Sequence, residues 1–378
     1  MIRPTVARVD LGAIKNNFRQ ITEHLASERS SNPPGVIAVV KANAYGHGAG
    51  QVARALADAG ADVLACADIE EGAALRASGL LGEILIFGAL SVSDLDGLFD
   101  CGLTPTISTP GAARAVQAAA RKYKRRVRYH LKIDTGMNRL GFRYDNLRRS
   151  LPELLASENL ELDAVYTHFA TADDPDSPLF AEQRLRFERA LGEIRSMHRP
   201  GGRPFYVHAC NSAALLRDSR VWYDRVRPGL LLYGIVPPPL ASTIPLVPSM
   251  TLVSRVVAVK GIRPGEGVGY GMRFMAESPR NIAVIPAGYA DGLDLRLAGR
   301  GVVLIGGARA PIVGAVSMDM LSADVTGLNV SPGDEVVILG SQGADRVDVR
   351  EMAATIGTIP WEISCRVGSR IERVYDNG

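Results

Sequence analysis

Residues 36–59 read VIAVVKANAYGHGAGQVARALADA, an apolar run followed by a polar loop and a segment with a different pattern. The first five residues are all apolar, which is typical of a strand buried on both faces of a parallel sheet. In the last segment Val52, Ala55, Leu56 and Ala59 repeat at the spacing of one helix face. The stretch therefore predicts a strand, a loop and a helix in that order.

The same unit recurs along the chain. Seven more apolar runs are separated by segments that include helical periodicity, and they are Val63–Ala67, Ile84–Phe87, Thr104–Ile107, Val127–Ile133, Leu162–Tyr166, Phe205–His208 and Arg225–Leu230. A helix-like segment, Ala13–Leu25, precedes the first strand. Eight strand-helix units predict an α/β fold, a (β/α)8 or TIM barrel, over residues 1–240.

A second, mostly β domain is predicted over residues 241–378. Its expected strands are separated by Gly and Pro turns, and they are Leu252–Val259, Ile282–Ile285, Val302–Ile305, Ile312–Val316 and Glu335–Leu339. The proline-rich stretch Val236–Leu240 cannot form a regular helix, so we place the hinge there. We expect the first residues, up to about residue 10, to pack with this second domain.

Composition restricts the class of partner. The 378 residues carry 43 Lys and Arg against 40 Asp and Glu, a net charge of +3, which disfavours a nucleic-acid-binding surface. The basic run Arg121–Arg128 is better explained as a solvated helix end. The amino terminus lacks a signal-peptide pattern, and no apolar run approaches the roughly 18 residues of a membrane helix. We expect a cytoplasmic enzyme acting on a small molecule, without membrane or nucleic-acid binding.

No metal or dinucleotide site is expected. The cysteines Cys66, Cys101, Cys210 and Cys365 are far apart and form no C-x-x-C pair, so buried reduced thiols are predicted. The glycine-rich stretch Gly265–Gly271 lacks the spacing and the following helix of a dinucleotide fingerprint.

Polar residues follow the predicted strands at their carboxyl ends, where barrel enzymes carry their active sites. They include Lys41, Lys132, Arg139, His168, Ser212 and Arg227. Lys41 by itself would be interpreted as a solvated strand end, because lysines at such positions more often face the solvent. A lysine that points into a barrel mouth is desolvated, however, which lowers its pKa and favours Schiff-base chemistry with a carbonyl.

Three motifs resemble those of alanine racemase, a pyridoxal-phosphate-dependent family with a barrel and a β domain. They are Ala38–Gly48 around Lys41, the Gly-Tyr-Gly of residues 269–271, and Pro311–Met320. The resemblance covers nearly the whole chain. It implies an isomerase that interconverts L-alanine and D-alanine, supplying D-alanine for peptidoglycan and the bacterial cell wall, by two-base proton transfer on the cofactor-bound amino acid.

The resemblance also implies that Lys41 holds pyridoxal 5'-phosphate as a Schiff base. Around the phosphate we expect the hydroxyls of Tyr45 and Ser212 and the backbone N–H groups of Gly229 and Leu230, since the loops after the last two strands are the usual phosphate site of barrels. Gly229 could otherwise be an ordinary turn residue after a proline.

Arg227 is expected to face the pyridine nitrogen of the cofactor, as in the family. A guanidinium only donates hydrogen bonds, so the ring nitrogen would be an unprotonated acceptor and a weaker electron sink, which discourages side reactions. An ion pair between Arg227 and Asp224 at the strand edge is the alternative. His168 is placed among the cofactor-binding residues as well.

Lys41 and Tyr270 are the two expected bases, one on each face of the substrate. A tyrosine has an unperturbed pKa of about 10, so Tyr270 needs cationic or hydrogen-bonded neighbours, and His168 and Arg227 are the candidates. Without the resemblance, Tyr270 would be interpreted as a packed turn residue.

The resemblance implies that Arg139, Met318 and Asp319 bind or line the substrate site. Lys132 matches a position that is often carbamylated in the family, and carbamylation would convert a cation that repels Arg139 into an anion that holds it. Tyr289 resembles the tyrosine at the entrance.

The family forms head-to-tail homodimers, so Tyr270, Met318 and Asp319 are expected to serve the neighbouring subunit's site. One departure is Trp361, which stands where the family commonly has a tyrosine near a cofactor-phosphate or entrance contact. A serine racemase, a related barrel decarboxylase and a non-catalytic pyridoxal-phosphate carrier remain as alternatives. The carrier resembles the barrel alone.

Overall fold

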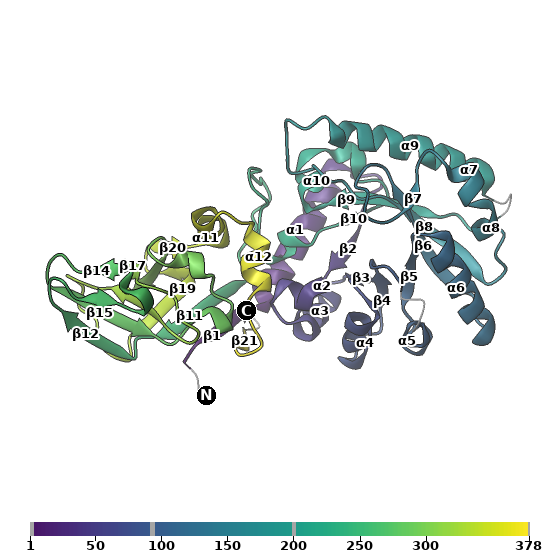
Figure 1. Ribbon diagram of the computed structural model, residues 1–378. Helices are drawn as coiled ribbons and strands as arrows, with labels where there is room; N and C mark the ends of the chain where they lie inside the picture. The colour runs from purple at the N-terminus through teal and green to yellow at the C-terminus, as the bar shows by residue number, and fades with distance from the viewer. Residues whose placement is uncertain (1–3, 91–94, 199–201, 377–378) are drawn as a thin grey trace. The chain divides into compact units, whose positions relative to one another are not determined.

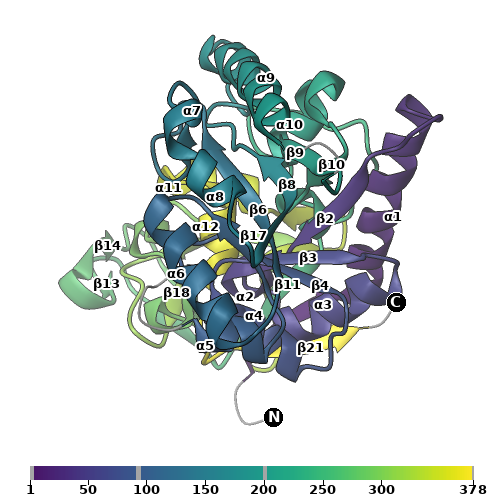
Figure 2. The same cartoon turned by 90° about the vertical axis from the view of Figure 1, so that its right-hand side faces the viewer.

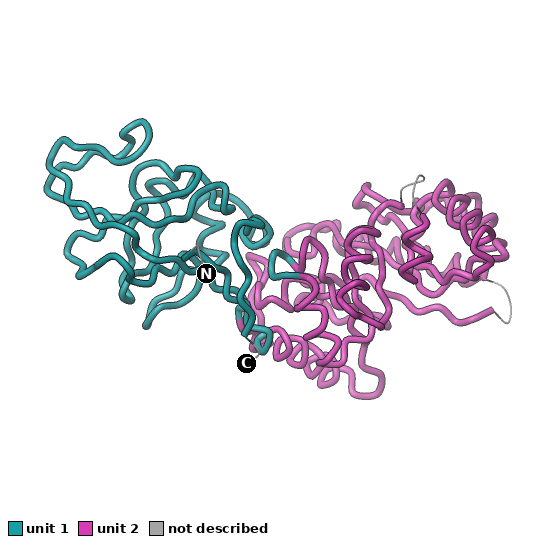
Figure 3. Tube along the Cα trace, turned by 90° about the horizontal axis from the view of Figure 1, so that it is seen from below, with its two compact units in different colours: residues 1–13, 45–48, 248–378 teal, residues 14–44, 49–247 magenta. Residues whose placement is uncertain are grey.

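The computed structural model describes residues 4–90, 95–198 and 202–376. The chain forms two compact units, which Figure 3 shows in different colours. Unit 1 comprises residues 1–13, 45–48 and 248–378, and unit 2 comprises residues 14–44 and 49–247. The loop 45–48 thus groups with unit 1, although it follows a barrel strand in the sequence.

Unit 2 is a closed barrel of eight parallel strands (Figure 2). The strands are β2 (Gly35–Val39), β3 (Val63–Cys66), β4 (Glu83–Ile86), β5 (Thr104–Ile107), β6 (Val127–Asp134), β8 (Leu160–Tyr166), β9 (Tyr206–Asn211) and β10 (Arg225–Arg227). They hydrogen-bond in the order β5, β4, β3, β2, β10, β9, β8 and β6, and β6 pairs with β5 to close the ring. The predicted barrel is confirmed, and each apolar run overlaps one strand.

Helices cover the outside of this barrel, as α4, α6 and α9 show in Figure 2. The helices are α1 (Leu11–Glu28), whose first residues belong to unit 1, α3 (Ala49–Asp58), α4 (Ile69–Ala77), α5 (Asp96–Asp100), α6 (Pro110–Lys122), α7 (Leu147–Ser150), α8 (Pro152–Leu155), α9 (Leu179–Met197) and α10 (Ser212–Arg217). Short additions are β7 (Phe142–Arg143) beside β6 and the 3-10 helices η1 (Ser219–Val221) and η2 (Leu230–Tyr233). The basic run is a helix end as predicted, because α6 stops at Lys122, which pairs with Asp96 at 2.9 Å.

The strands carry buried polar side chains as well as apolar ones. His130 and His208 are fully buried on β6 and β9, and Thr106, Lys132 and Arg227 are almost fully buried on their strands. Buried polar groups need hydrogen-bond partners. The barrel core is therefore partly polar, which places titratable groups along its axis.

Unit 1 is built on one large sheet, of which β11, β15 and β19 are labelled in Figure 1. Its strand order is β12, β15, β18, β17, β16, β19, β11, β1 and β21. These strands are β1 (Val6–Asp10), β11 (Met250–Arg255), β12 (Ala258–Ile262), β15 (Arg280–Ile285), β16 (Val302–Ile305), β17 (Ala308–Val313), β18 (Leu321–Asp324), β19 (Glu335–Gln342) and β21 (Glu372–Asp376). The remaining elements are β13 (Gly267–Val268), η3 (Tyr270–Met272), β14 (Phe274–Met275), η4 (Tyr289–Asp291), η5 (Leu295–Leu297), β20 (Asp345–Val347), α11 (Val349–Ile356) and α12 (Pro360–Cys365). The predicted mostly β domain is confirmed.

Four of the five predicted strands of unit 1 have different bounds. Strand β15 begins two residues earlier than predicted and β19 ends three residues later, while the other two differ more. The single strand predicted over Leu252–Val259 is in fact two, β11 and β12, because Val256 hydrogen-bonds to Asp334 whereas Val257 bonds to Val284 on a different strand. Strand β17 ends at Val313 rather than Val316, since Gly314 takes a φ of +68°. A Cβ on Gly314 would lie 2.5 Å from a carbonyl oxygen, so only glycine fits this bend.

Asn17 of α1 holds the end of unit 2. Its amide nitrogen donates to the Val247 carbonyl at 2.7 Å, and its amide oxygen accepts from the Val247 N–H at 2.8 Å. Unit 2 consequently extends to Val247, beyond the boundary that the sequence suggests at residue 240. The proline-rich stretch before this point is not helical.

The four cysteines are all free thiols. Cys66 and Cys210 are buried as predicted, but Cys101 is only partly buried and Cys365 is exposed. The expectation of burial was wrong for Cys365 because it occupies the solvent-facing side of the short helix α12. In the described part of the chain, no helix has both the length and the apolar character needed to cross a membrane.

Candidate active site

Lys41 follows strand β2 and begins an unusual turn, labelled α2 (Lys41–Tyr45). The next residues, Ala42, Asn43 and Ala44, have φ angles of 53°, 53° and 55°, in the left-handed region. Each such non-glycine residue costs roughly 1–2 kcal/mol relative to the right-handed conformation. Contacts from elsewhere in the barrel must therefore hold the turn in place.

The Glu71 carboxylate supplies these contacts. It accepts from the Ala42 N–H at 2.7 Å with one oxygen and from the Ala67 N–H at 2.8 Å with the other. The Asn43 side chain adds a bond by accepting from the Ala49 N–H at 2.8 Å. Sequence analysis did not single out Glu71. Its spacing from Asp68 has the form of a helix capping box, which signals the start of α4 but no contact with the Lys41 turn.

Arg227 is 4% exposed at the end of β10. Its Nη1 donates to His208 Nδ1 at 2.7 Å, and its Nη2 donates to the carbonyls of Thr167 and Ala209, both at 2.8 Å. The expected alternative, an ion pair with Asp224, is not present, because the Asp224 carboxylate instead accepts from a backbone N–H of β9. Among the described residues no carboxylate pairs with Arg227.

Burial lowers the pKa of Arg227 to about 10, which leaves the guanidinium charged at neutral pH. All its recorded partners are neutral or backbone acceptors, and no bond from Nε is recorded to the described residues. Its Cζ lies 5.2 Å from the centroid of the Tyr166 ring. Arg227 is thus a cation whose two terminal nitrogens are fixed by hydrogen bonds, while its Nε has no recorded partner among the described residues.

Lys132, on β6, is 5% exposed. Burial lowers its pKa to about 8, and the charges of Arg139, Arg227 and Lys41 act in the same direction. These four cations therefore occupy the same end of the barrel, as predicted from their places after the strands. The Arg139 charge thus disfavours a charged Lys132 amine, and Arg139 itself is exposed and in no recorded ion pair with the described residues.

His168 is neutral in this surrounding. Desolvation, followed by the Arg227 charge, holds the pKa of its imidazole well below the usual range. Its Nδ1 lies 3.4 Å from Arg227 Nη2. Of the two ways in which His168 was expected to assist Tyr270, as a cation or as a hydrogen-bonding neighbour, burial beside a guanidinium therefore favours the second.

The two loops expected at the phosphate meet in the structure. The Gly229 N–H donates to Ser212 Oγ at 3.0 Å. Gly229 has a φ of −114°, so its backbone conformation does not require glycine. Leu230 begins η2, and the first N–H groups of a helix have no partner within it. Ser212 and the start of η2 thus offer hydrogen-bond donors at one place.

The remaining predicted residues belong to unit 1. They are Tyr45, Tyr270, Tyr289, Met318 and Asp319. Tyr270 is 78% exposed, which rules out a packed turn residue within its own chain. Burial raises the pKa of Tyr45, so its phenol stays protonated.

Tyr289 and Met318 lie on adjoining segments. The Tyr289 N–H donates to the Ser317 carbonyl at 3.0 Å, and the next N–H donates to the Met318 carbonyl at 3.1 Å. Asp319 pairs with Arg370 at 2.6 Å, a residue that sequence analysis did not single out. Its position near the carboxyl end, far from Asp319 in sequence, gave no signal.

Comparison with known proteins gives the same family in every case. Residues 9–237 match the alanine racemase N-terminal domain family, and residues 249–375 match the C-terminal domain family. An alanine racemase from Carboxydothermus hydrogenoformans is 41% identical over 380 residues, covering 99% of this chain and all of the relative.

Two solved structures extend this similarity. Alanine racemase from D-cycloserine-producing Streptomyces lavendulae has a TM-score of 0.93 at 33% identity, covering 100% of this chain and 98% of that one. Alanine racemase from Bartonella henselae, solved with covalently bound pyridoxal phosphate, has a TM-score of 0.87 at 30% identity, covering 99% of each chain. This chain therefore belongs to the alanine racemase family.

Proposed function

We propose that this protein is an alanine racemase that interconverts L-alanine and D-alanine, with pyridoxal phosphate held by Lys41. The observation that carries the proposal is the cluster of Lys41, Lys132, Arg139 and Arg227 at one end of the barrel. A phosphorylated cofactor and an amino-acid carboxylate are both anionic, so they fit this cluster. When bound, pyridoxal phosphate draws electrons from the substrate Cα and makes its proton acidic.

The residues present fit the cofactor. Ser212 and Leu230 offer donors to a phosphate, with Tyr45 as a further protonated hydroxyl, whereas the Gly229 N–H donates to Ser212 Oγ and would reach a phosphate only in place of that bond. Arg227 offers a guanidinium that has no carboxylate partner in the described structure and can only donate. His168 completes this group as a neutral neighbour of Arg227. If the Arg227 guanidinium lay at the ring nitrogen, it would moderate the electron demand of the cofactor, which would suit proton exchange without further reaction.

Two bases are needed to invert a stereocentre, because a proton leaves one face and arrives at the other. We assign these roles to Lys41 and Tyr270. Arg139 and the Met318 backbone would hold the substrate carboxylate, Asp319 would line the site, and Tyr289 would restrict the entrance to short side chains.

A second copy of the chain would complete the site. Large apolar side chains are exposed on unit 1, and they are Tyr270, Met272, Met275, Leu295, Met318 and Met320. Tyr270 and Leu295 line one groove. Exposed apolar groups of this kind mark interaction surfaces. We infer a head-to-tail homodimer in which Tyr270 serves the site of the partner subunit.

Complementation tests the dimer. We expect the Lys41→Ala and Tyr270→Ala variants each to be inactive, and mixing them after reversible dissociation should restore about a quarter of the activity. Half of the randomly paired dimers are mixed, and each mixed dimer has one intact site of two. No restored activity, with mixed dimers shown by mass spectrometry of differently labelled chains, would contradict the shared site.

Lys132 is a candidate for carbamylation. A pKa of about 8 leaves a substantial fraction of the amine neutral near physiological pH, and a neutral amine can react with carbon dioxide. The product is an anion, which would attract Arg139 instead of repelling it.

Incubation of the purified, cofactor-loaded protein with L-alanine in D2O tests the function itself. We expect deuterium at Cα together with loss of optical activity. Release of carbon dioxide would indicate the decarboxylase, and absence of exchange would indicate a carrier. A parallel incubation with L-serine measures how strictly the entrance around Tyr289 limits the size of the substrate side chain. It also tests the effect of Trp361, which stands where the family commonly has a tyrosine.

A further inference from the structure

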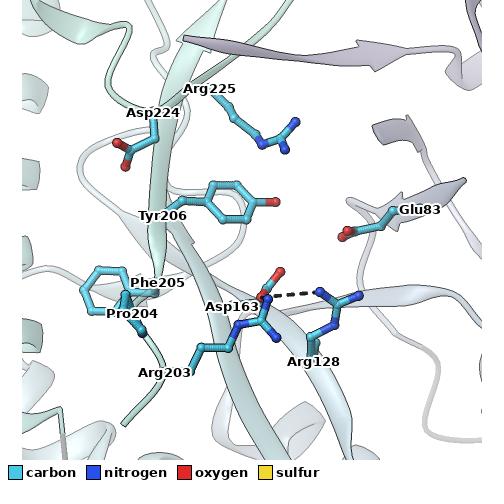
Figure 4. A pocket seen from close by; sticks show the side chains of 9 residues that line it. All are labelled: Glu83, Arg128, Asp163, Arg203, Pro204, Phe205, Tyr206, Asp224 and Arg225. Carbon is cyan, nitrogen blue, oxygen red and sulfur yellow. Dashed lines mark ion pairs between the residues drawn. The ribbon is translucent and has the colours of Figure 1, made fainter. Parts of the chain in front are cut away.

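A second polar cavity lies at the amino-terminal end of the barrel strands, opposite the end that holds Lys41 (Figure 4). Its volume is about 390 Å³. Glu83, Tyr206 and Arg225, which begin β4, β9 and β10, are among the residues that line it. Figure 4 shows the Tyr206 phenol reaching into the cavity, with its hydroxyl on the side of the Glu83 carboxylate.

Three hydrogen bonds connect this cavity with Arg227 through the middle of the barrel. Arg227 Nη1 lies 2.7 Å from His208 Nδ1, His208 Nε2 lies 3.1 Å from His130 Nδ1, and His130 Nε2 lies 2.9 Å from the Tyr206 hydroxyl. Both histidines are fully buried. The His208 ring also stacks on Tyr166, with centroids 4.6 Å apart and planes 11° apart.

Both imidazoles in this chain are neutral. Burial, followed by the Arg227 charge, lowers the pKa of His130 to about 3 and that of His208 well below its usual range. A neutral imidazole has one N–H donor and one acceptor nitrogen. Each ring must therefore donate on one side and accept on the other.

Arg227 determines the direction of donation along the three hydrogen bonds, because a guanidinium can only donate. His208 Nδ1 is consequently an acceptor, and His208 carries its hydrogen on Nε2. That hydrogen is donated to His130 Nδ1, so His130 carries its own hydrogen on Nε2 and donates it to the Tyr206 oxygen.

The reverse order fails. If Tyr206 donated to His130 Nε2, His130 would donate from Nδ1 to His208 Nε2. His208 would then carry a hydrogen on Nδ1, which would face an Arg227 N–H at 2.7 Å. Two donors cannot share that distance, so one arrangement remains.

We infer that Arg227, His208, His130 and Tyr206 form a one-way chain of hydrogen bonds, in which His130 is a positioning residue for Arg227. By accepting from His208 Nε2, His130 keeps His208 Nδ1 without a proton, and Nδ1 is the acceptor that orients one arm of the guanidinium. The tautomers follow from the three hydrogen-bond distances, the neutrality of the buried imidazoles and the donor character of the guanidinium. The consequence for catalysis rests on the proposed function.

The same region contains Glu83, His130 and Asp163, whose ligand atoms lie within 4.8 Å of one another. A metal ion there would need His130 Nε2, which Tyr206 already occupies. Asp163 also lies 3.7 Å from Arg128 and 3.6 Å from Arg203, and these cations disfavour a further positive charge. The hydrogen-bond chain therefore explains the cluster better than a metal.

Long-range 1H–15N NMR of full-length protein labelled at histidine tests the tautomers directly, without any activity measurement. We expect His130 and His208 to carry the hydrogen on Nε2, with Nδ1 unprotonated, between pH 6 and 8. A hydrogen on Nδ1 of either ring, or a doubly protonated ring in this range, would overturn the assignment. Addition of Zn2+ should leave both rings unchanged, and a zinc-induced loss of the Nε2 hydrogen of His130 would indicate a metal site instead.

A matched pair of variants tests the positioning role. His130→Asn keeps an acceptor close to the place of Nδ1, whereas His130→Leu has a similar size and no acceptor. We expect His130→Leu to lower kcat about 10-fold, the value of one lost hydrogen bond, and to alter the His208 Nδ1 signal. His130→Asn should keep kcat within about threefold of the wild-type value and leave the His208 Nδ1 signal unchanged. Equal behaviour of the two variants would overturn the proposal.

Tyr206→Phe provides a second, milder variant in case His130→Leu does not fold. It removes only the last acceptor of the chain, so the tautomers should persist while the His130 Nε2 hydrogen exchanges faster with solvent. Unchanged exchange would show that the chain does not reach Tyr206. Expected tautomers in a protein that does not exchange the alanine Cα proton would contradict the proposed function and leave the hydrogen-bond chain intact.

Discussion

The turn around Lys41 and the loop around Tyr270 present the two proposed bases by opposite means. Tyr270 lies between Gly269 and Gly271, whose φ angles of 70° and 71° cost little, and its side chain is 78% exposed. Lys41 precedes Ala42 and other non-glycine residues in the left-handed conformation, which the Glu71 carboxylate holds.

The Lys41 turn and the Tyr270 loop therefore differ in which contacts of the same chain support them. The barrel end is finished within unit 2, because its cations are buried or near one another and its backbone is clamped by hydrogen bonds. The Tyr270 loop carries one left-handed non-glycine residue, Met272 with a φ of 46°, beside its two glycines, and it is open to solvent within its own chain, which fits the proposed cover by a partner subunit. The following predictions test this contrast.

Removal of the Lys41 amine should have the largest effect. Lys41→Ala eliminates both the attachment of the cofactor and one base, so racemisation should fall at least about 10⁴-fold. Polarimetry with L-alanine measures the rate, and the visible absorbance of the lysine-bound cofactor should vanish. Lys260→Ala, at an exposed lysine of β12, is the control and should retain both.

Tyr270→Phe should lower the rate by about 10²- to 10³-fold, a typical loss for one acid-base group. Deuterium exchange should show selective loss of proton removal from L-alanine. Because Tyr270 is exposed in its own chain, the melting temperature of the dissociated subunit should hardly change. Equal loss with L-alanine and D-alanine would argue against two separate bases.

Lys132→Met should stabilise the protein at pH 7 by up to about 3 kcal/mol, the equivalent of a pKa lowered from 10.5 to about 8. Below pH 8 the wild type must bury a charged amine. Between pH 8 and 10.5 the folded protein binds fewer protons than the unfolded chain, so wild-type stability rises and the difference shrinks. Urea unfolding in carbonate-free buffer measures it, with the exposed Lys260→Met as control. A pH-independent difference would contradict the assignment.

Glu71→Gln should have a smaller effect on stability, about 1–3 kcal/mol. An amide has one acceptor oxygen, so one of the Ala42 and Ala67 N–H groups loses its partner. Racemisation should fall as the Lys41 turn relaxes. Glu70→Gln, the exposed neighbour on the same helix, should change neither urea unfolding nor rate. Similar losses in both variants would assign the effect to helix charge instead.

The two units also differ in how much of their structure could be predicted from the sequence. The barrel follows from apolar runs alternating with helical periodicity, and both are local patterns. The strand break after Val256 and the early end of β17 were not predictable, because they depend on which distant strand accepts each N–H. Strand β1 also needed the structure, since its partners β11 and β21 lie at the far end of the chain.

Local sequence patterns are sufficient to predict the fold class, the place of the polar residues after the strands, and the motifs around Lys41 and Tyr270. Which of these residues contact one another depends on the folded chain. Arg227, His208 and His130 come from three strands, and their contact depends on the closure and register of the barrel. The contact between the Glu71 carboxylate, in the first turn of α4, and the Lys41 turn likewise joins two segments that are distant in the sequence. Each residue type fixes which chemical groups a side chain carries. The pKa values, tautomers and hydrogen-bond partners of those groups depend on desolvation and on interatomic distances, which are set only when the chain folds.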